Sequence, residues 1–267
     1  MKILNGSELA GFIKERHAKQ VRSLSGRKIT PRLAIVQVKD DPVINTYVRL
    51  KQQYGADIGV EVEIHHPQQS AAPNLINQLN DDPAVQGIIV QLPLSEPAQT
   101  DHIVNLVKPE KDVDSLGQNS QFEPATPMAI MWLLAGYNVE LAGKKILVIG
   151  RGKLVGAPLE KLLKGSGYNV QSIDRSVKDL AGYTKEADVV ITATGSPAVL
   201  YANMIKQNAV VVDAGVASEE GKTVGDLAPD VYNRDDLTLT PEKGGVGPLT
   251  VCALFENVIR AAQNAQG

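Results

Sequence analysis

Short apolar runs recur along the chain, separated by stretches in which apolar residues repeat with helical spacing. This alternation predicts βαβ units and therefore a parallel sheet with helices on its faces. Three runs precede residue 120 and four follow residue 140, which favours two α/β domains. The predicted strands are residues 32–38, 60–65, 85–92, 144–149, 169–173, 187–192 and 209–213.

Two segments are predicted to connect the domains. Residues 108–127 are rich in Pro, Asp, Asn and Gln and show little periodicity, so we interpret them as the first interdomain crossing. Pro127 is predicted to start a helix at its first position. Residues 128–137 would continue it with apolar residues on most faces, as a helix wedged between two domains requires.

A second crossing is predicted near the C-terminus, where the glycine-rich segment 244–248 precedes a helical pattern. This last helix, with Leu249, Phe255 and Ile259 among its apolar residues, is expected to pack back on the first domain. The predicted domains are residues 1–124 together with 248–267, and residues 125–247.

Composition agrees with this plan, because 267 residues are roughly twice the commonest domain size of about 100 to 150 residues. Hydrophobic residues make up 43% of the chain and aromatic residues only 4%, which predicts an aliphatic core. The net charge of -3 argues against a surface that follows nucleic-acid phosphates.

The cysteine count and the apolar runs bear on the compartment. Cys252 is the one cysteine, so no internal disulfide can form, and the sequence shows no Cys/His spacing typical of a metal site. No run approaches the roughly 20 residues that span a bilayer, and residues 1–6 lack the apolar stretch of a signal peptide. We expect a cytoplasmic protein that binds neither membrane nor nucleic acid.

A glycine-rich turn follows the predicted strand 144–149. Gly150, Gly152 and Gly156 have the spacing Gly-x-Gly-x-x-x-Gly, one residue longer than the common dinucleotide fingerprint. Strand, glycine turn and helix start would place backbone N–H groups where a pyrophosphate can bind. The pattern predicts a Rossmann-type second domain, with a purely structural turn as the alternative.

The end of the next strand bears on the choice between NADP and NAD. Asp174 could accept a hydrogen bond from a free ribose hydroxyl, as NAD requires, whereas Arg175 and Arg151 could pair with the 2′-phosphate of NADP. Solvated loop charges are a third interpretation.

In the first half, Asp40, Asp41 and Pro42 predict a helix start. Tyr47 and Lys51, four residues apart, would then share one helix face. By themselves they could be a surface pair, and they become a candidate site if other polar groups converge on them.

Two segments could supply such groups. Gln91 ends an otherwise apolar strand, and open α/β sheets bind ligands beyond the carboxyl ends of their strands; a satisfied buried amide is the alternative. Asp112 and Asp114 could be a metal pair or a solvated loop. With no further acid or histidine at ligand spacing, no metal site is expected.

Taken in order, the motifs resemble one family over nearly the whole chain, the bifunctional methylenetetrahydrofolate dehydrogenase/methenyltetrahydrofolate cyclohydrolase, or FolD, family. The motifs that carry the resemblance are Tyr47-Val48-x-x-Lys51, Val90-Gln91-Leu92-Pro93-Leu94, Lys111-Asp112-Val113-Asp114, Thr126-Pro127, Gly150-Arg151 with Val155-Gly156-Ala157-Pro158, Gly225-Asp226, and Gly244-Gly245-Val246-Gly247-Pro248-Leu249-Thr250.

The resemblance implies an enzyme of one-carbon metabolism and purine biosynthesis, whose first domain binds folate, whose second domain binds NADP, and which pairs as a homodimer. By position, Lys51 would be catalytic, Tyr47 would lie over the folate ring system, Gln91 would orient Lys51, and Asp114 would bind the pterin. Desolvation beside a cationic substrate would lower the pKa of Lys51 and suit it to carry a proton.

The candidate residues fall into three sets. The catalytic candidates are Lys51, Tyr47 and Gln91, and the substrate-binding candidates are Tyr47, Asp114, Gln91, Gly247 and Pro248. The dinucleotide-binding candidates are Gly150, Arg151, Gly152, Val155, Gly156, Asp174, Arg175, Thr194 and Gly195, with NADP favoured and NAD possible.

The chain also departs from the family pattern. It has Ile44 and Gly152 where the family usually has Ser, Ser115 where it has Gly, and Ala125 where it has Cys; residues 242–243 are Glu-Lys instead of Val-Pro. Two alternatives follow: another NAD(P)-dependent dehydrogenase with this two-domain plan, or a folate-binding protein that has lost turnover.

Overall fold

In the computed structural model, which describes residues 1–219 and 222–265, the chain forms two compact units. Unit 1 comprises Met1–Ala10 and Thr126–Thr250, and unit 2 comprises Gly11–Ala125 and Val251–Gly267. The chain therefore passes from one unit to the other three times. Each unit contains its own parallel sheet, so the α/β fold class predicted from the sequence is confirmed.

Unit 2 contains a three-stranded parallel sheet in the order β3-β2-β4. Its strands are β2 (Arg32–Val36), β3 (Glu61–His65) and β4 (Gly87–Val90). They confirm the first three predicted strands, with ends trimmed by up to two residues. Beyond β2 and β4 the chain continues into loops through polar residues, Gln37 and Gln91.

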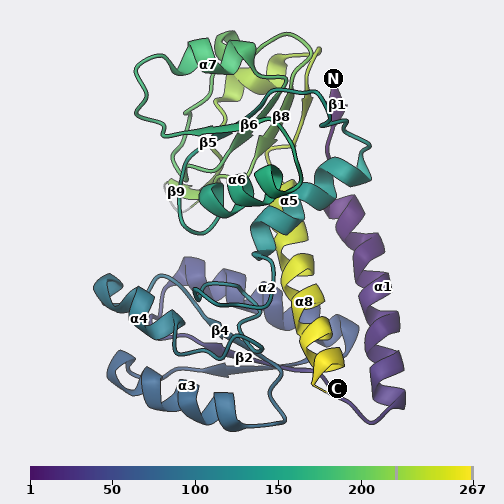
Figure 1. Cartoon of the computed structure of the whole chain (residues 1–267), viewed down its shortest axis with the longest axis vertical. Coiled ribbons are helices and arrows are strands. Elements are labelled where there is room, and N and C mark those ends of the chain that lie inside the picture. Colours follow the sequence, from purple (N-terminus) through teal and green to yellow (C-terminus); the bar gives the residue numbers. More distant parts are fainter. Residues whose placement is uncertain (220–221, 266–267) are drawn as a thin grey trace. The chain divides into compact units, whose positions relative to one another are not determined.

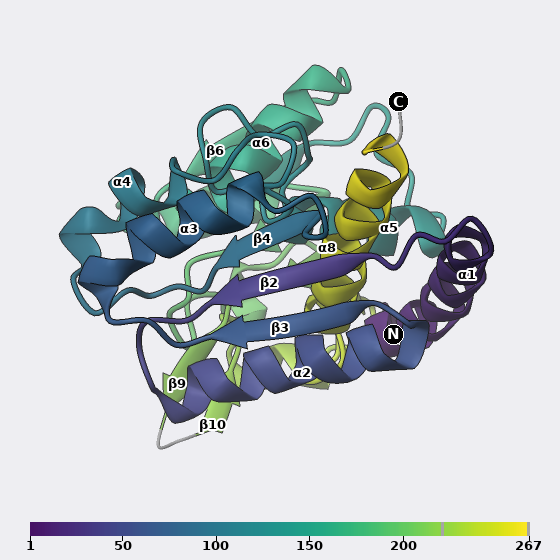
Figure 2. The same ribbon diagram turned by 90° about the horizontal axis from the view of Figure 1, so that it is seen from below.

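The helices of unit 2 lie against this sheet, with α2 alongside β3 and α3 alongside β4 and β2 (Figure 2). The helix start predicted at residues 40–42 is confirmed: Asp41 caps α2 and accepts hydrogen bonds from the backbone N–H groups of Val43 and Ile44. The elements are α2 (Pro42–Ile58), α3 (Ala72–Asp81), α4 (Thr100–Val104) and the 3-10 turns η1 (Gln69–Ala71) and η2 (Pro97–Gln99).

Unit 1 contains a six-stranded parallel sheet in the order β1-β11-β8-β7-β5-β6, part of which is labelled in Figure 1. Four of its strands confirm predictions, namely β5 (Ile146–Ile149), β6 (Val170–Ile173), β7 (Val189–Thr192) and β8 (Val210–Asp213). The sequence did not indicate β1 (Lys2–Ile3) and β11 (Thr238–Leu239), because two residues show no periodicity. The remaining strands, β9 (Ala217–Glu219) and β10 (Lys222–Val224), pair antiparallel with each other.

The helices that lie wholly or almost wholly in unit 1 are short. The prediction that Pro127 starts a helix at its first position is wrong in register: α5 begins at Ala125, so Pro127 lies within the first turn, where its missing N–H costs no hydrogen bond. The elements are α5 (Ala125–Gly136), α6 (Gly156–Gly165), α7 (Leu180–Glu186) and the 3-10 turns η3 (Ala202–Met204) and η4 (Pro229–Asn233).

Two long helices contribute residues to both units. They are α1 (Gly6–Gly26) and α8 (Val246–Asn264). From Val251 onward α8 belongs to unit 2, where Phe255, Val258 and Ile259 are fully buried. The predicted return of the C-terminal helix to the first domain is confirmed.

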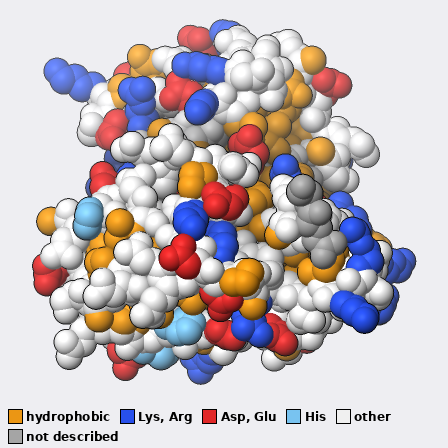
Figure 3. All heavy atoms as spheres, turned by 60° about the horizontal axis from the view of Figure 1, so that its bottom comes forward, with side chains coloured by type: hydrophobic (Ala, Val, Ile, Leu, Met, Phe, Trp, Pro, Cys, Tyr) orange, Lys and Arg blue, Asp and Glu red, His pale blue; other side chains and the backbone are white. Residues whose placement is uncertain are grey.

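The cores are aliphatic, as the composition predicts. In unit 1, residues such as Ile149, Val190 and Val211 pack in one cluster, and in unit 2 Val36, Ile76 and Ile88 pack in another. On the face drawn in Figure 3, acidic and basic side chains are interspersed. Among the described residues, no helix is long and apolar enough to cross a membrane.

Candidate active site

The central contact of the candidate site joins two segments of unit 2 that lie forty residues apart in the sequence. Lys51 Nζ on α2 donates a hydrogen bond of 2.8 Å to Gln91 Oε1, directly beyond β4. Gln91 is itself fixed, because its backbone N–H donates to the carbonyl of Val36 and its Nε2 donates to the carbonyl of Leu92. The structure therefore brings the predicted lysine and amide together.

The environment of Lys51 changes its protonation. Burial lowers the pKa of the Lys51 ammonium below its usual range, and the negative charge of Asp114 partly opposes this shift. Both side chains are half-buried. A lysine with a lowered pKa reaches its neutral form at lower pH, and in that form the nitrogen can accept a proton.

The crossing loop that holds Asp114 is shaped by its neighbour Asp112. Asp112 is buried, and its carboxylate accepts hydrogen bonds from the backbone N–H groups of Gly117 at 2.8 Å and Leu116 at 3.3 Å. Desolvation raises the pKa of Asp112 to about 6. Asp112 is thus not a solvated loop charge. Both of its carboxylate oxygens are used in hydrogen bonds to the backbone, which is the role of a structural residue and not of a metal ligand. It fixes the loop from which Asp114 projects.

Ser115 occupies a backbone conformation that favours glycine. Its φ is 55°, and its hydroxyl donates a hydrogen bond of 2.8 Å to the carbonyl of Phe122. Glycine, which the family resemblance leads us to expect at this position, adopts such a φ without strain. The hydrogen bond from the Ser115 hydroxyl to Phe122 partly offsets the backbone strain of this positive φ.

Tyr47 and Ile44 lie on α2 near Lys51. Tyr47 is half-buried one helical turn before Lys51, as the spacing predicted. Ile44 is buried, with 4% of its surface exposed. The chain therefore has a buried apolar side chain where the family resemblance leads us to expect a serine.

Unit 1 contains the predicted glycine turn between β5 and α6. A Cβ placed on Gly156 would lie 1.9 Å from the Gly150 carbonyl oxygen, so the turn closes only because this position has no side chain. Gly150 has φ of 105°, which other residues rarely adopt. The N-cap of α6, Val155, makes no side-chain capping hydrogen bond. Ala157 donates its N–H to the Gly152 carbonyl at 3.1 Å and Pro158 has no N–H, so at the start of α6 the N–H of Gly156 is the group that can bind a phosphate.

Asp174 and Arg175, in the loop after β6, lie near Arg151 of the glycine turn after β5. Asp174 Oδ1 accepts a hydrogen bond of 2.9 Å from the backbone N–H of Ser176, and this bond lowers the pKa of Asp174, with smaller contributions from Arg175 and Arg151. All three charged side chains are exposed. Gly152, between the glycines of the turn, has open space where a Cβ would be.

The remaining candidates also have definite places in unit 1. Thr194 and Gly195 follow β7, and Gly247 and Pro248 lie in the first turn of α8. The structure thus groups the dinucleotide candidates at the carboxyl ends of β5, β6 and β7. It groups Tyr47, Lys51, Gln91 and Asp114 in unit 2.

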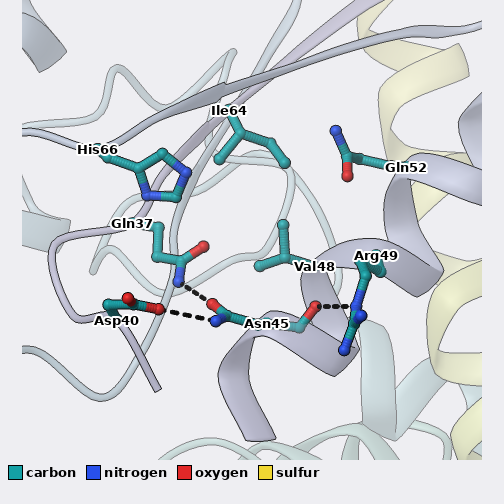
Figure 4. Close-up of a pocket in the computed structure, with 8 residues that line it drawn as sticks. All are labelled: Gln37, Asp40, Asn45, Val48, Arg49, Gln52, Ile64 and His66. Atoms are coloured by element: carbon teal, nitrogen blue, oxygen red, sulfur yellow. Dashed lines mark hydrogen bonds between the residues drawn. The ribbon is translucent and has the colours of Figure 1, made fainter. Parts of the chain in front are cut away.

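Sequence reasoning missed a cavity of about 430 Å³ that is lined from α2 and from the ends of β2 and β3 (Figure 4). Gln37, only 2% exposed, donates a hydrogen bond of 2.6 Å to Asn45 Oδ1 there, and Asn45 donates to Asp40. Gln37 lies directly after β2, as Gln91 does after β4, so a polar residue at the end of an apolar run is the signal that indicates both positions. The lining residues are Gln37, Asp40, Asn45, Val48, Arg49, Gln52, Ile64 and His66.

Comparison with known proteins finds two family models along the chain. The catalytic-domain model of tetrahydrofolate dehydrogenase/cyclohydrolase matches residues 4–114, and the NAD(P)-binding-domain model of the same family matches residues 124–266. The bifunctional protein FolD of Nautilia profundicola is 34% identical over 278 residues, covering 99% of this chain and 98% of that protein.

Solved structures give the same result. The bifunctional FolD dehydrogenase/cyclohydrolase of Campylobacter jejuni superposes with a TM-score of 0.93 at 35% identity, covering 99% of both chains. The Trypanosoma brucei dehydrogenase-cyclohydrolase, solved in complex with NADP cofactor and inhibitor, superposes with a TM-score of 0.92 at 29% identity. The match covers 99% of this chain and 98% of that one.

Proposed function

The chain belongs to the tetrahydrofolate dehydrogenase/cyclohydrolase family, and from this we propose that it catalyses two consecutive reactions on one folate. The first oxidises methylenetetrahydrofolate to methenyltetrahydrofolate with hydride transfer to NADP. The second hydrolyses the methenyl group to give formyltetrahydrofolate. The observation that carries this proposal is the hydrogen bond of 2.8 Å between Lys51 Nζ and Gln91 Oε1.

The oxidation places few chemical demands on the protein. A folate nitrogen lone pair assists the loss of hydride from the methylene carbon, so no general base is needed. Bound NADP supplies the hydride acceptor. The protein contributes positioning, and alignment of reacting groups can supply a large part of the rate.

The hydrolysis does require proton transfer. Water adds to the methenyl carbon and loses a proton. The ring C–N bond then breaks as its nitrogen gains a proton and the added hydroxyl loses its proton to become the formyl carbonyl, so that one proton is released overall. We assign the transfer to Lys51, since its lowered pKa makes the neutral amine available and Gln91 fixes the nitrogen. Tyr47 would contact the folate ring system, and Asp114 would accept hydrogen bonds from donors on the pterin.

We assign folate to the candidate residues of unit 2 and the dinucleotide to unit 1. That Gly247 and Pro248, at the start of α8, contact folate remains a prediction from the family resemblance. The glycine turn supports the second assignment, because Gly150 and Gly156 have no side chains and the turn can therefore close against the start of α6, as a phosphate-binding turn requires. Gly150, Arg151, Gly152, Val155 and Gly156 would hold the pyrophosphate. Thr194 and Gly195 would line the loop beyond it.

We further propose that NADP is preferred over NAD. Asp174 is engaged by the backbone N–H of Ser176, while Arg151 and Arg175 carry guanidinium groups beside it that can pair with a 2′-phosphate. The preference should be smaller than in relatives with serine in place of Gly152. Comparing kcat/KM for the two cofactors tests this proposal. Arg175→Ala should lower the NADP/NAD ratio, and a wild type that prefers NAD would make Asp174 the ribose ligand.

The assembly and compartment are proposed from the family. We propose a homodimer that works in the cytoplasm. A single cysteine, buried in α8, fits a reducing compartment because it cannot form a disulfide within the chain. Light scattering of the purified protein should give twice the mass of the chain, and a monomer mass across the working concentration range would reject the dimer.

Mixing the protein with methylenetetrahydrofolate and either NADP or NAD tests the function. Reduced nicotinamide should form together with methenyl product, followed by formyl product. Folate binding without turnover would instead favour a binding protein. Oxidation of other substrates with no response to folate would favour a different dehydrogenase.

A further inference from the structure

A buried carboxylate holds the loop after β7 in unit 1. Asp226 is fully buried, its Oδ2 accepts a hydrogen bond of 2.7 Å from the backbone N–H of Thr194, and its Oδ1 accepts one of 3.0 Å from that of Ser196. The side chain thus reaches across thirty residues of sequence to bind both ends of a three-residue segment.

The same loop contacts the glycine turn on its other side. A Cβ placed on Gly150 would lie 2.4 Å from the carbonyl oxygen of Ala193 and 3.2 Å from the backbone nitrogen of Thr194. The loop at residues 193–196 is therefore held between the phosphate-binding turn and Asp226. A shift of this loop would change the shape of the turn.

A second carboxylate fixes Asp226. Asp213, at the end of β8, accepts hydrogen bonds from the backbone N–H groups of Asp226, at 2.9 Å to Oδ2, and of Leu227, at 3.1 Å. The hydroxyl of Thr192 in β7 donates to Asp213 Oδ1 at 3.2 Å. The loops after β7 and β8 and the segment at residues 225–227 thus form one hydrogen-bonded assembly.

Two glycines make room for these carboxylates. A Cβ on Gly215 would lie 1.9 Å from Asp226 Oδ1, and a Cβ on Gly225 would lie 2.1 Å from Asp213 Oδ2. Neither distance is possible between real atoms. The position of each carboxylate therefore requires the glycine facing it.

Stability alone does not explain this arrangement. Burying a carboxylate costs free energy, and in the described part of the chain the hydrogen-bond donors to the Asp226 side chain are backbone N–H groups, with no cation among them. Asp226 fixes the conformation of the loop at residues 193–196, which on its other side contacts Gly150.

We propose that Asp226 is a positioning residue of the dinucleotide site, acting through the backbone at residues 193–196, with Asp213 and Thr192 as its supports. The proposal rests on the assignment of NADP to unit 1. It makes Asp226 a determinant of dinucleotide affinity although its side chain lies buried behind the loop.

Asp226→Asn tests the proposal, since the amide retains one acceptor and turns N–H groups toward the other backbone donor. Titration of the full-length protein with NADPH, followed by nicotinamide fluorescence, should show a dissociation constant raised about tenfold or more, the effect of losing one hydrogen bond to a charged group. Folate affinity should change less than about twofold in the same variant.

Asp188→Asn is the matched control. Asp188 directly precedes β7, at the end of the strand opposite to Thr192. Like Asp226, it accepts a backbone hydrogen bond, from the N–H of Lys145, and it also pairs with Lys206. Its substitution should leave NADPH affinity unchanged. Thr192→Val is a milder variant that keeps the shape of a buried side chain, and it should raise the NADPH dissociation constant by about two- to fivefold.

Three results would overturn the proposal: unchanged NADPH affinity in both Asp226→Asn and Thr192→Val, an equal loss in Asp188→Asn, or a parallel loss of folate affinity. If the Asp226→Asn protein does not fold, the NADPH dissociation constant of Thr192→Val decides, and an unchanged value in that variant rejects the proposal. Failure of the proposed function itself is distinguishable, because the wild-type protein would then bind no NADPH.

Discussion

Replacing Lys51 by methionine removes the ammonium group and keeps most of the side-chain volume. The change deletes the hydrogen bond of 2.8 Å to Gln91 Oε1 and leaves the other bonds of Gln91, from its backbone N–H to Val36 and from Nε2 to Leu92, in place. The site should therefore lose its proton carrier without losing the shape of the segment that follows β4.

The effect on stability should be small because two contributions oppose each other. A hydrogen bond from a charged group contributes about 1.5–3 kcal/mol. Burial disfavours the charged ammonium, as the lowered pKa of Lys51 shows, and methionine removes that cost. The free energy of unfolding should change by about 1 kcal/mol or less, within the range of ordinary substitutions.

The effect on catalysis should be large and confined to one reaction. General acid–base catalysis contributes about 10²–10⁴ in rate, which is about 3–5 kcal/mol of barrier. Conversion of methenyl- to formyltetrahydrofolate should fall by that factor. The dehydrogenase should fall less than about tenfold, because hydride transfer needs alignment and no base. The assay follows loss of methenyl absorbance in one cuvette and formation of reduced nicotinamide in another.

Lys111→Met is the control. Lys111 also has a pKa lowered by burial, and its Nζ donates to the carbonyls of Leu79 at 3.0 Å and Asp82 at 2.6 Å. Its loss should reduce stability and leave the ratio of the two activities unchanged. Retained cyclohydrolase activity in a folded Lys51→Met protein would refute the role of Lys51.

Wild-type pH dependence gives a second check on Lys51. The neutral amine is the active form in proton abstraction, so cyclohydrolase kcat should rise with pH and level off above the pKa of Lys51, below the usual lysine value of 10.5. The free energy of unfolding should change with pH in the same direction. Because the pKa of Lys51 is lower in the folded state, folding releases a proton, and the protein becomes more stable as pH rises toward the pKa of the unfolded state. A kcat that falls across this range would contradict proton abstraction by Lys51.

Three further substitutions test other parts of the account. Asp114→Asn should weaken folate binding by about tenfold or more and dinucleotide binding less than about twofold, measured by separate titrations, since a charge-assisted hydrogen bond contributes about 1.5–3 kcal/mol; equal losses would indicate a purely structural role. Gly152→Ser should raise the NADP/NAD ratio of kcat/KM with no loss of stability, because a Cβ there meets open space, and an unchanged ratio would remove this glycine from the account of cofactor choice. Ser115→Gly relieves a φ of 55° and deletes the bond to Phe122, two effects of about 1 kcal/mol each, so thermal unfolding should shift by only a few degrees; a large loss would mean that the hydroxyl contact dominates.

Local features of the fold were predictable because their causes lie within a few residues. Asp41 starts α2 by accepting hydrogen bonds from the amides of Val43 and Ile44, and several strands of the two sheets, such as β4 and β5, are continuous apolar runs. By contrast, β1 pairs with β11 across more than two hundred residues, and neither has a pattern of its own.

The candidate site divides in the same way. The spacing of Tyr47 and Lys51 places both on one helix face, and the end of a strand indicated Gln91, but only the fold brings Nζ within 2.8 Å of the amide. The interaction of Asp226 with Thr194 and Ser196 had no local signal beyond the pair Gly225-Asp226, because the loop that it binds lies thirty residues away.

The most direct test of the central claim is a time course of the wild-type protein with methylenetetrahydrofolate and NADP in which nicotinamide, methenyl and formyl species are followed together. The account predicts one reduced nicotinamide for each methylene group consumed, with methenyl product rising first and formyl product replacing it faster than in a sample with Lys51→Met protein. Reduced nicotinamide with methenyl product that persists equally in both samples would contradict the claim that this chain hydrolyses its own product through Lys51.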